Sequence, residues 1–178
     1  MVKQLVAAQN DFFATQKTKD VSFRKQYLKK LQQEIIDQED AICDALYADF
    51  KKPKFESLAT ETQFALSELK HAIKNVESWS EPERVSASWS NFPSKEWIQP
   101  EPYGKVLIIS PWNYPFMLAI SPLIGALAAG NTAILKPSEF STNTSKIISR
   151  IIRKVFPPEY VTVVEGGVEV SQQLLAEK

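Results

Sequence analysis

Residues 106–139 read VLIISPWNYPFMLAISPLIGALAAGNTAILKPSE, and this stretch decides the fold. Its first apolar run, 106–109, is typical of a strand that is buried on both faces of a parallel sheet. Two prolines then end any regular element, because each lacks an amide hydrogen and restricts the residue before it. The mostly apolar segment 116–129 predicts a helix that ends at Gly130. Residues 132–135 predict a second strand, so the whole stretch predicts a right-handed βαβ unit.

Polar residues follow both strands of this unit. Trp112 and Asn113 come after the first strand, and the run from Lys136 to Glu139 comes after the second. Open parallel sheets bind ligands just beyond the carboxyl ends of their strands. We therefore expect both polar clusters to lie at a ligand-binding edge of the sheet.

The rest of the chain predicts helices in front of this unit and more of the sheet behind it. Apolar residues near the helical period, Phe50 and Phe55 among them, predict the buried faces of helices over 3–18, 21–50 and 55–79. Later segments predict a helix over 143–155 capped by residues 140–143, a strand over 161–164 and a helix over 171–178. This order predicts an α/β fold, half of a doubly wound layer with helices in front.

Residues 80–102 are rich in proline and aromatic side chains, which predicts loops and short strands. Residues 97–99 predict an edge strand. Trp79, Trp89 and Trp97 lie in or beside this segment. We expect them to seal the helical layer onto the sheet; the alternative is a contact between subunits, where such residues are enriched.

The composition is that of an ordinary globular protein. Of 178 residues, 44% are hydrophobic and 24% are charged, and the net charge is zero, so nothing favours binding to nucleic acid. The basic cluster Lys51, Lys52 and Lys54 predicts a solvated helix end. One cysteine and no signal peptide predict a cytoplasmic protein. Polar and helix-breaking residues interrupt the apolar segment 116–135, which argues against a membrane span.

Asn113 lies between two turns that proline restricts. A carboxamide stays neutral and offers two N–H donors, so a rigidly held Asn113 is able to stabilise an oxyanion that develops on a carbonyl. The alternative is that Asn113 only satisfies the backbone of the turn, and the local pattern by itself favours that alternative.

Lys136 and Glu139 are three residues apart, just after the second strand. The two side chains are able to share the hydroxyls of a nucleotide ribose, where a glutamate accepts from the 2′-hydroxyl and repels a 2′-phosphate. The alternative is an exposed loop with a weak ion pair. The pattern does not decide between the two.

Other reactive residue types give weaker signals. No G-x-G-x-x-G motif and no P-loop occurs, and the pair Gly166-Gly167 predicts a simple turn. Cys43 lies inside the predicted helix 21–50, which indicates a structural cysteine and no nucleophile. His71 is the sole histidine and predicts a surface side chain, so no metal site is expected.

Four motifs, taken in order, resemble the aldehyde dehydrogenase superfamily. They are Pro111-Trp112-Asn113-Tyr114-Pro115, Ala128-Ala129-Gly130-Asn131-Thr132, Leu135-Lys136-Pro137-Ser138-Glu139 and Val163-Val164-Glu165-Gly166-Gly167. Their order and spacing match across residues 100–167. The helical start and the form PWNYPF resemble the N-terminal portion of the class 3 branch.

The resemblance implies an activity and a set of site residues. It implies oxidation of an aldehyde to a carboxylic acid through a cysteine thiohemiacetal, with NAD as cofactor and NADP as the alternative. By matching position, Asn113 is the oxyanion-stabilising amide, and Tyr114 packs near the substrate tunnel. The cofactor-binding residues are Ile109, Ser110, Pro111, Trp112, Lys136, Ser138 and Glu139, of which Lys136 and Glu139 hold the adenosine ribose.

The resemblance also implies a domain plan. Residues 1–80 form an N-terminal helical segment, 81–105 a linker with short strands, and 106–178 the first half of a Rossmann-like NAD(P)-binding domain. The glycine turn for the pyrophosphate, the glutamate base and the cysteine nucleophile are expected beyond Lys178, and the catalytic domain that carries the thiol is expected to be absent from this chain. The complete enzyme is expected to be a homodimer, and this chain alone to be inactive. The rival hypothesis is a non-catalytic nucleotide-binding or interaction module.

Overall fold

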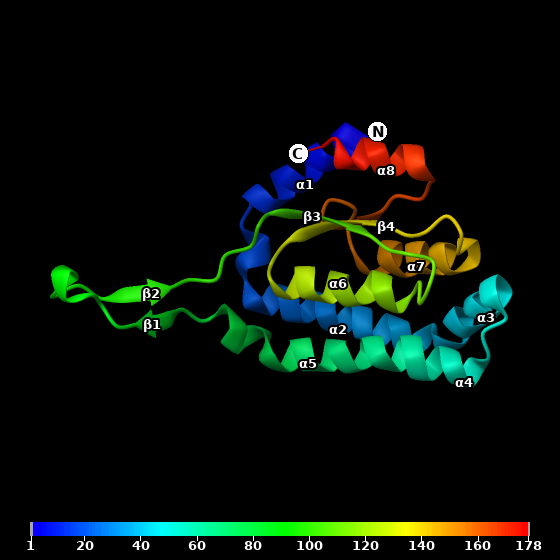
Figure 1. Cartoon of the computed structure of the whole chain (residues 1–178), viewed down its shortest axis with the longest axis horizontal. Coiled ribbons are helices and arrows are strands. Elements are labelled where there is room, and N and C mark those ends of the chain that lie inside the picture. The colour runs from blue at the N-terminus through cyan, green and yellow to red at the C-terminus, as the bar shows by residue number, and fades with distance from the viewer. Residues whose placement is uncertain (1, 178) are drawn as a thin grey trace.

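The computed structural model describes residues 2–177, which run from helices through a hairpin into a sheet (Figure 1). The helices are α1 (Val2–Ala14), α2 (Val21–Asp37), α3 (Glu39–Phe50), α4 (Lys54–Ser57), α5 (Gln63–Ser80), α6 (Met117–Ala128), α7 (Thr142–Val155) and α8 (Val168–Leu175). The strands are β1 (Glu83–Val85), β2 (Glu96–Ile98), β3 (Lys105–Ile109), β4 (Thr132–Lys136) and β5 (Val161–Val163). The predicted α/β fold, with helices before a parallel sheet, is confirmed.

Strands β3, β4 and β5 form a parallel sheet in that order. Ile109 pairs with Lys136, and Leu135 pairs with Val163. The carboxyl ends of the three strands therefore meet at one edge, as the βαβ pattern predicts. All five residues of β4 are buried, which is why its sequence is a nearly continuous apolar run.

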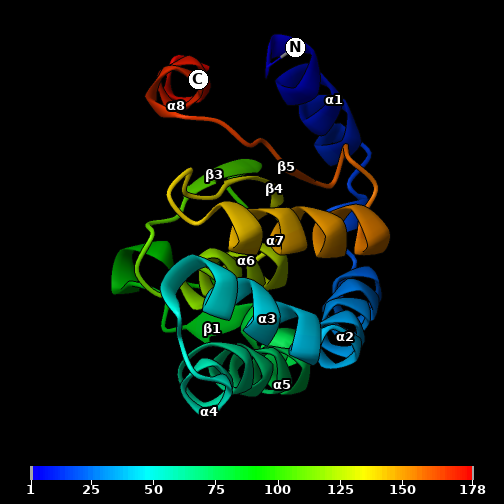
Figure 2. The same ribbon diagram turned by 90° about the vertical axis from the view of Figure 1, so that its right-hand side faces the viewer.

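Helices cover both faces of this sheet (Figure 2). Helices α6 and α7 lie on one face with α2, α3 and α5 outside them, and the main core there includes Leu28, Leu69 and Leu135, all fully buried. Helices α1 and α8 cover the other face, where Val6 and Leu174 belong to a smaller core. The main core thus joins the N-terminal helices to the sheet.

The predicted stop after the crossover helix is confirmed at Gly130 and Asn131. Gly130 has a φ of 89°, and a β-carbon there would come within 2.9 Å of the carbonyl oxygen of Thr18. The Asn131 side-chain oxygen accepts the backbone N–H of Gly104 at 2.9 Å. The turn therefore fixes the start of β4 against the start of β3.

The prediction of one helix over 21–50 is wrong, because the chain turns at Gln38. That residue has φ −105° and ψ 9°, which ends α2 and begins α3. Helix α2 then packs against α5, while α3 packs against α7. Glu39 and Asp40 stand in the first turn of α3, where acidic side chains are favoured. Their position was a signal for the break.

The predicted helix over 55–79 forms as α4, a π-helical turn (η2, Leu58–Thr62) and α5. The π-turn brings Glu61 and Thr62 inward, and both are 0% exposed. Phe50 and Phe55, expected on buried faces, are 37% and 83% exposed. They flank the turn between α3 and α4, which lies at one end of the helical layer (Figure 1).

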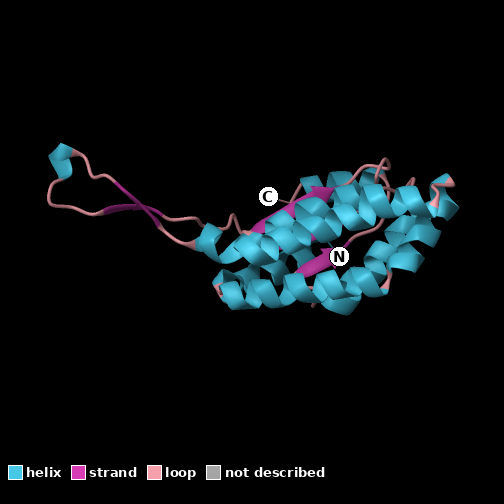
Figure 3. Ribbon diagram, turned by 90° about the horizontal axis from the view of Figure 1, so that it is seen from below, coloured by secondary structure: helices cyan, strands magenta, loops and turns pink. Residues whose placement is uncertain are grey.

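A two-stranded hairpin extends away from the body of the molecule (Figure 3). The predicted edge strand at 97–99 forms as β2, but it pairs only with β1, where Arg84 lies opposite Trp97. The expectation that tryptophans seal the helical layer is wrong, because Trp79, Trp89 and Trp97 are 47%, 98% and 53% exposed. Two of them belong to the hairpin, which has no layer of the described chain behind it.

The last predicted helix begins earlier than expected. Helix α8 begins at Val168 instead of residue 171, and Lys178 lies outside the described residues. Gly166 precedes it with a φ of 152°, and a β-carbon there would come within 2.4 Å of the Val170 side chain. Among the described helices, none is long and apolar enough to cross a membrane.

Candidate functional site

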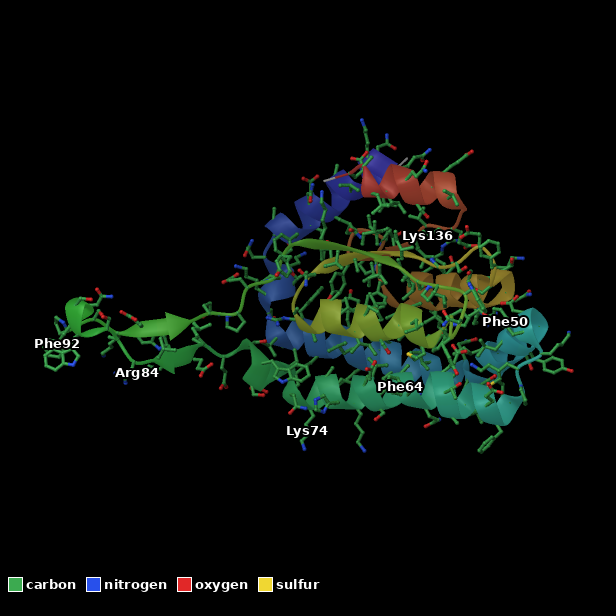
Figure 4. All side chains as sticks on the ribbon, in the orientation of Figure 1. Phe50, Phe64, Lys74, Arg84, Phe92 and Lys136 are labelled. Atoms are coloured by element: carbon green, nitrogen blue, oxygen red, sulfur yellow. The ribbon has the colours of Figure 1, made fainter. Side chains whose placement is uncertain are left out.

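The two predicted polar clusters lie at the same edge of the sheet. The backbone N–H of Ser110 donates to the carbonyl oxygen of Lys136 at 3.1 Å, directly after the last paired residues of β3 and β4. Beyond β5, the N–H of Val164 donates to the carbonyl oxygen of Leu135 at 2.9 Å. Figure 4 shows Lys136 near this edge, with Phe50 on the neighbouring helical layer.

The loop between β3 and α6 exposes the first four residues of the PWNYP motif. Asn113 is exposed, and its side chain hydrogen-bonds to no other described residue. Trp112 and Tyr114 are 57% and 42% exposed. A cavity of about 250 Å³ is lined by these three residues together with Phe50, Lys51, Lys52, Pro53, Glu56, Glu61 and Pro115. The Asn113 amide therefore keeps both N–H donors available beside an open cavity that is partly lined by aromatic side chains.

Lys136 and Glu139 do form an ion pair, but the loop is not an exposed one. Lys136 is the last residue of β4 and is 3% exposed, and its Nζ lies 2.5 Å from Glu139 Oε2. Hydrogen bonding from Lys136 lowers the pKa of the Glu139 carboxyl below its ordinary value. The pair thus presents a charged carboxylate on a backbone that the strand holds fixed.

Ser138 has a structural task in the same loop. Its carbonyl oxygen accepts the Ser145 hydroxyl at 2.8 Å and the Ser141 hydroxyl at 3.2 Å, at the start of α7. A cavity of about 180 Å³ lies beside it, lined by Pro137, Ser138, Glu139, Thr142, Ser145, Glu165 and Gly166. A β-carbon on Gly167 would lie 3.9 Å from a Glu139 carboxylate oxygen. The LKPSE and EGG motifs therefore form one site, although sequence reasoning assigned only a simple turn to the glycines.

Five of the predicted site residues border these two cavities, and the other four, Ile109, Ser110, Pro111 and Lys136, border neither. Trp112, predicted to line the cofactor cleft, borders the Asn113 cavity. Ser138 and Glu139 border the other cavity. Ile109 is 44% exposed at the end of β3, whereas Ser110 is 4% exposed and its hydroxyl has no partner among the described residues. Pro111 is exposed at the start of the loop.

Sequence reasoning missed two charged residues that support the Asn113 loop. Glu61 is fully buried, and it accepts the Lys52 ammonium at 2.7 Å. Lys52 belongs to the basic cluster that was expected to be solvated, yet its side chain is 10% exposed and lies over the Tyr114 ring at 4.3 Å. That expectation is wrong for Lys52. The π-turn that buries Glu61 leaves no signal in the hydrophobic pattern. The one available signal was the position of Glu61, a charged residue on the apolar face of the predicted helix.

A third missed residue supports the Glu139 loop. The cap predicted from residues 140–143 does not form, since Ser141 makes no side-chain cap bond to α7. Asp49 of α3 caps that helix instead, accepting the backbone N–H groups of Asn143 at 3.0 Å and Thr144 at 2.8 Å. Burial raises the pKa of Asp49, but the hydrogen bonds from Thr144 and Asn143 outweigh it and lower the pKa overall. Long-range caps of this kind are not visible in local sequence.

The remaining reactive side chains, Cys43 and His71, lie in surroundings that do not favour a nucleophile. Cys43 is 3% exposed in α3, and burial raises the pKa of its thiol, which fits the predicted structural role. His71 is exposed on α5, as predicted, and its ring lies 5.4 Å from that of Trp79. No group of three metal-binding side chains occurs among the described residues.

Comparison with known proteins assigns this arrangement to a family. The sequence profile of the aldehyde dehydrogenase family matches residues 1–178. The chain belongs to the aldehyde dehydrogenase family. Its class 3 resemblance is confirmed as well, because mouse aldehyde dehydrogenase family 3 member B3 is 41% identical over 166 residues, which are 93% of this chain and 35% of that protein.

Bacterial aldehyde dehydrogenases are also similar. The 4,4'-diaponeurosporen-aldehyde dehydrogenase of Staphylococcus aureus is 49% identical over 164 residues, 92% of this chain and 36% of that protein. A solved substrate-bound state of Staphylococcus aureus AldH superposes with a TM-score of 0.96 at 47% identity, covering 98% of this chain and 38% of that one. The chain thus spans about a third of the length of these aldehyde dehydrogenases.

Proposed function

We propose that the chain is the N-terminal part of an NAD(P)+-dependent aldehyde dehydrogenase that oxidises aldehydes to carboxylic acids. The observation that carries this proposal is the Asn113 amide, which has two unused donors beside a cavity at the carboxyl edge of a parallel sheet. Membership of the family supports the reaction type. The position of this amide beside the cavity supports a site that receives the carbonyl oxygen of an aldehyde.

The chemical role of Asn113 follows from its position. When a thiolate adds to an aldehyde, the carbonyl oxygen becomes an oxyanion, and a neutral amide donor lowers the energy of that charge without changing protonation. Tyr114 lines the same cavity, and we propose that it packs near the substrate. The thiol itself is proposed to come from outside this chain, because Cys43 is buried within α3.

The second cavity suits the adenosine half of a dinucleotide. The Glu139 carboxylate is charged and able to accept ribose hydroxyls, while the Lys136 ammonium has donors beyond the one that it gives to Glu139. Ile109, Ser110, Pro111 and Trp112 are proposed to line the path between the two cavities. When bound, NAD(P)+ supplies the hydride acceptor. Residues 106–178 are accordingly proposed as the first half of the cofactor domain.

The substrate class is proposed from the relatives. The similar proteins of Staphylococcus aureus and Cytobacillus firmus are named for 4,4'-diaponeurosporen-aldehyde and for 4,4'-diapolycopene-4,4'-dial. The Asn113 cavity has aromatic walls in Phe50, Trp112 and Tyr114, which suit an apolar aldehyde. We expect 4,4'-diaponeurosporen-aldehyde to be oxidised with a higher kcat/KM than acetaldehyde.

An activity assay tests the proposal. The protein is purified at the natural length at which its cells produce it, and the 178-residue chain is purified in parallel. Aldehyde-dependent formation of NADH or NADPH is then recorded for both proteins. We expect aldehyde oxidation by the protein of natural length and none by the 178-residue chain. Saturable nucleotide binding without any turnover by the protein of natural length would favour the non-catalytic module instead.

A further inference from the structure

The segment that carries Asn113 has little of its own to hold it in place. Tyr114, the next residue, has a φ of 50°, in the left-handed region that is unfavourable for a tyrosine. Phe116, the N-cap residue of α6, makes no side-chain cap bond. Within the loop, the Tyr114 carbonyl oxygen accepts the N–H of Leu118 at 2.9 Å, but the loop provides no acceptor for the amides of Phe116 and Met117. A contact from elsewhere in the chain is needed to fix this segment.

Glu61 provides that contact from the π-turn between α4 and α5. Its Oε2 accepts the backbone N–H of Phe116 at 2.8 Å and that of Met117 at 3.1 Å. The carboxylate is completely buried. A negative charge is favoured at the N-terminus of a helix, where free N–H groups and the helix dipole meet it. The start of α6 is therefore bound to the helical layer only three residues after Asn113.

Lys52 holds the other side of the same segment. Its ammonium donates to Glu61 Oε1 at 2.7 Å and lies 4.3 Å from the centre of the Tyr114 ring. The ring is thus held by a cation–π contact directly after Asn113. Lys52 also compensates the charge of Glu61. This matters because an uncompensated carboxylate in a buried site would oppose an oxyanion forming at Asn113.

We propose that Glu61 and Lys52 are positioning residues, which hold the Asn113 amide where it stabilises the oxyanion of the substrate. The inference rests on the proposed function. Neither residue needs to touch the substrate, since Glu61 acts through the start of α6 and Lys52 acts through the ring of Tyr114. The charge pair fixes the loop and leaves no net charge beside it.

Steady-state kinetics of the protein in its natural length test this role. Glu61→Gln keeps the size of the side chain and removes its charge, and we expect it to lower kcat at least tenfold while the Kd for NAD+ stays within twofold. A purely structural role would lower the amount of folded enzyme but leave kcat per folded molecule unchanged. A kcat within twofold of wild type would overturn the proposal.

Matched variants separate positioning from general loss of a buried ion pair. Glu34 is also buried and paired, with Lys154 at 2.6 Å, on α2. Glu34→Gln should therefore leave kcat unchanged. If Glu61→Gln does not fold, Lys52→Met takes its place, and Lys52→Arg, which keeps the charge and the ring contact, should retain more of the rate. Equal rates for Lys52→Met and wild type would contradict the proposal.

A measurement without turnover separates this inference from the proposed function. In the 178-residue chain, 15N relaxation reports the order of the backbone amides of Asn113 and Tyr114, and hydrogen exchange reports those of Phe116 and Met117. Glu61→Gln should loosen all four amides, while Glu34→Gln should not. Unchanged order in Glu61→Gln would overturn the positioning role. Absence of aldehyde oxidation by the wild-type protein, with the amides loosened as expected, would overturn only the proposed function.

Discussion

At the scale of single residues, we expect Glu139 to decide the preference between NAD+ and NADP+. Its carboxylate lies 2.5 Å from the buried Lys136 ammonium, and that hydrogen bond keeps its pKa low. The carboxylate is therefore charged throughout the neutral pH range. A fixed negative charge favours a ribose 2′-hydroxyl and repels a 2′-phosphate.

Replacement of Glu139 tests this preference. We expect Glu139→Gln to bring the Kd for NADP+ closer to that for NAD+ by roughly fivefold, since a charge contact of about 1 kcal/mol is removed. Fluorescence titration of both nucleotides into the protein of natural length measures the ratio. Glu83→Gln, an exposed change on the hairpin, is the control. An unchanged ratio in Glu139→Gln would remove the basis of the assignment.

At the scale of secondary-structure elements, carboxylates from the helical layer cap both crossover helices. Glu61 binds the start of α6, and Asp49 binds the start of α7. These two helix starts carry the loops that present Asn113 and Glu139. The N-terminal helices therefore do more than cover the sheet, because they fix the two loops at the carboxyl edge of its strands.

The cap on α7 should make stability depend on acid. The folded-state pKa of Asp49 is lower than its ordinary value of 3.8, so its contribution is complete above 3.8 and is lost as the pH falls through the lower folded value. Asp49→Asn should reduce the free energy of unfolding by about 1 kcal/mol at pH 7, and the difference should vanish at strongly acid pH. Denaturant titrations across pH measure it. Asp44→Asn, an exposed change on the same helix, should show no such trend.

Local sequence predicted the sheet well, because its signals are local. The strands at 106–109, 132–135 and 161–164 are short apolar runs ended by turn residues, and each forms where expected. The stop at Gly130 follows from a backbone conformation that other residues avoid. The strand ends then placed the LKPSE motif at the correct edge.

What local sequence did not show depends on contacts between distant segments. The π-turn at Leu58–Thr62, the burial of Lys52 and the cap by Asp49 each involve partners from other elements. Hydrophobic periodicity reports which face of a helix is buried, but not which polar group on that face has found a partner. The supports of the site were missed for this reason, while its loops were not.

At the scale of the whole molecule, the projecting hairpin carries aromatic side chains that the body of the molecule does not cover. Trp89 and Phe92 near its tip are 98% and 82% exposed. Exposed aromatic side chains on a projecting element are typical of a surface that another chain covers. We propose that the hairpin mediates homo-oligomer formation, as the family resemblance implies.

A double substitution at the tip tests this assignment. Trp89→Ser with Phe92→Ser should shift the protein of natural length toward monomer in light scattering, because apolar contact area is lost. The thermal midpoint of the 178-residue chain should stay within a few degrees, since neither side chain belongs to its core. Retention of the oligomer would place the contact elsewhere on the surface.

The most direct test of the central claim concerns Asn113, in the protein of natural length with an aldehyde and NAD+. We expect Asn113→Ala to lower kcat by roughly 10²–10³-fold, the usual loss when one oxyanion donor is removed, and to leave the Kd for NAD+ unchanged. Asn75→Ala, a change at a half-buried position on α5 that lines neither cavity, should leave kcat at the wild-type value. Equal kcat values for Asn113→Ala and wild type would contradict the proposed role of Asn113 as the donor to the oxyanion.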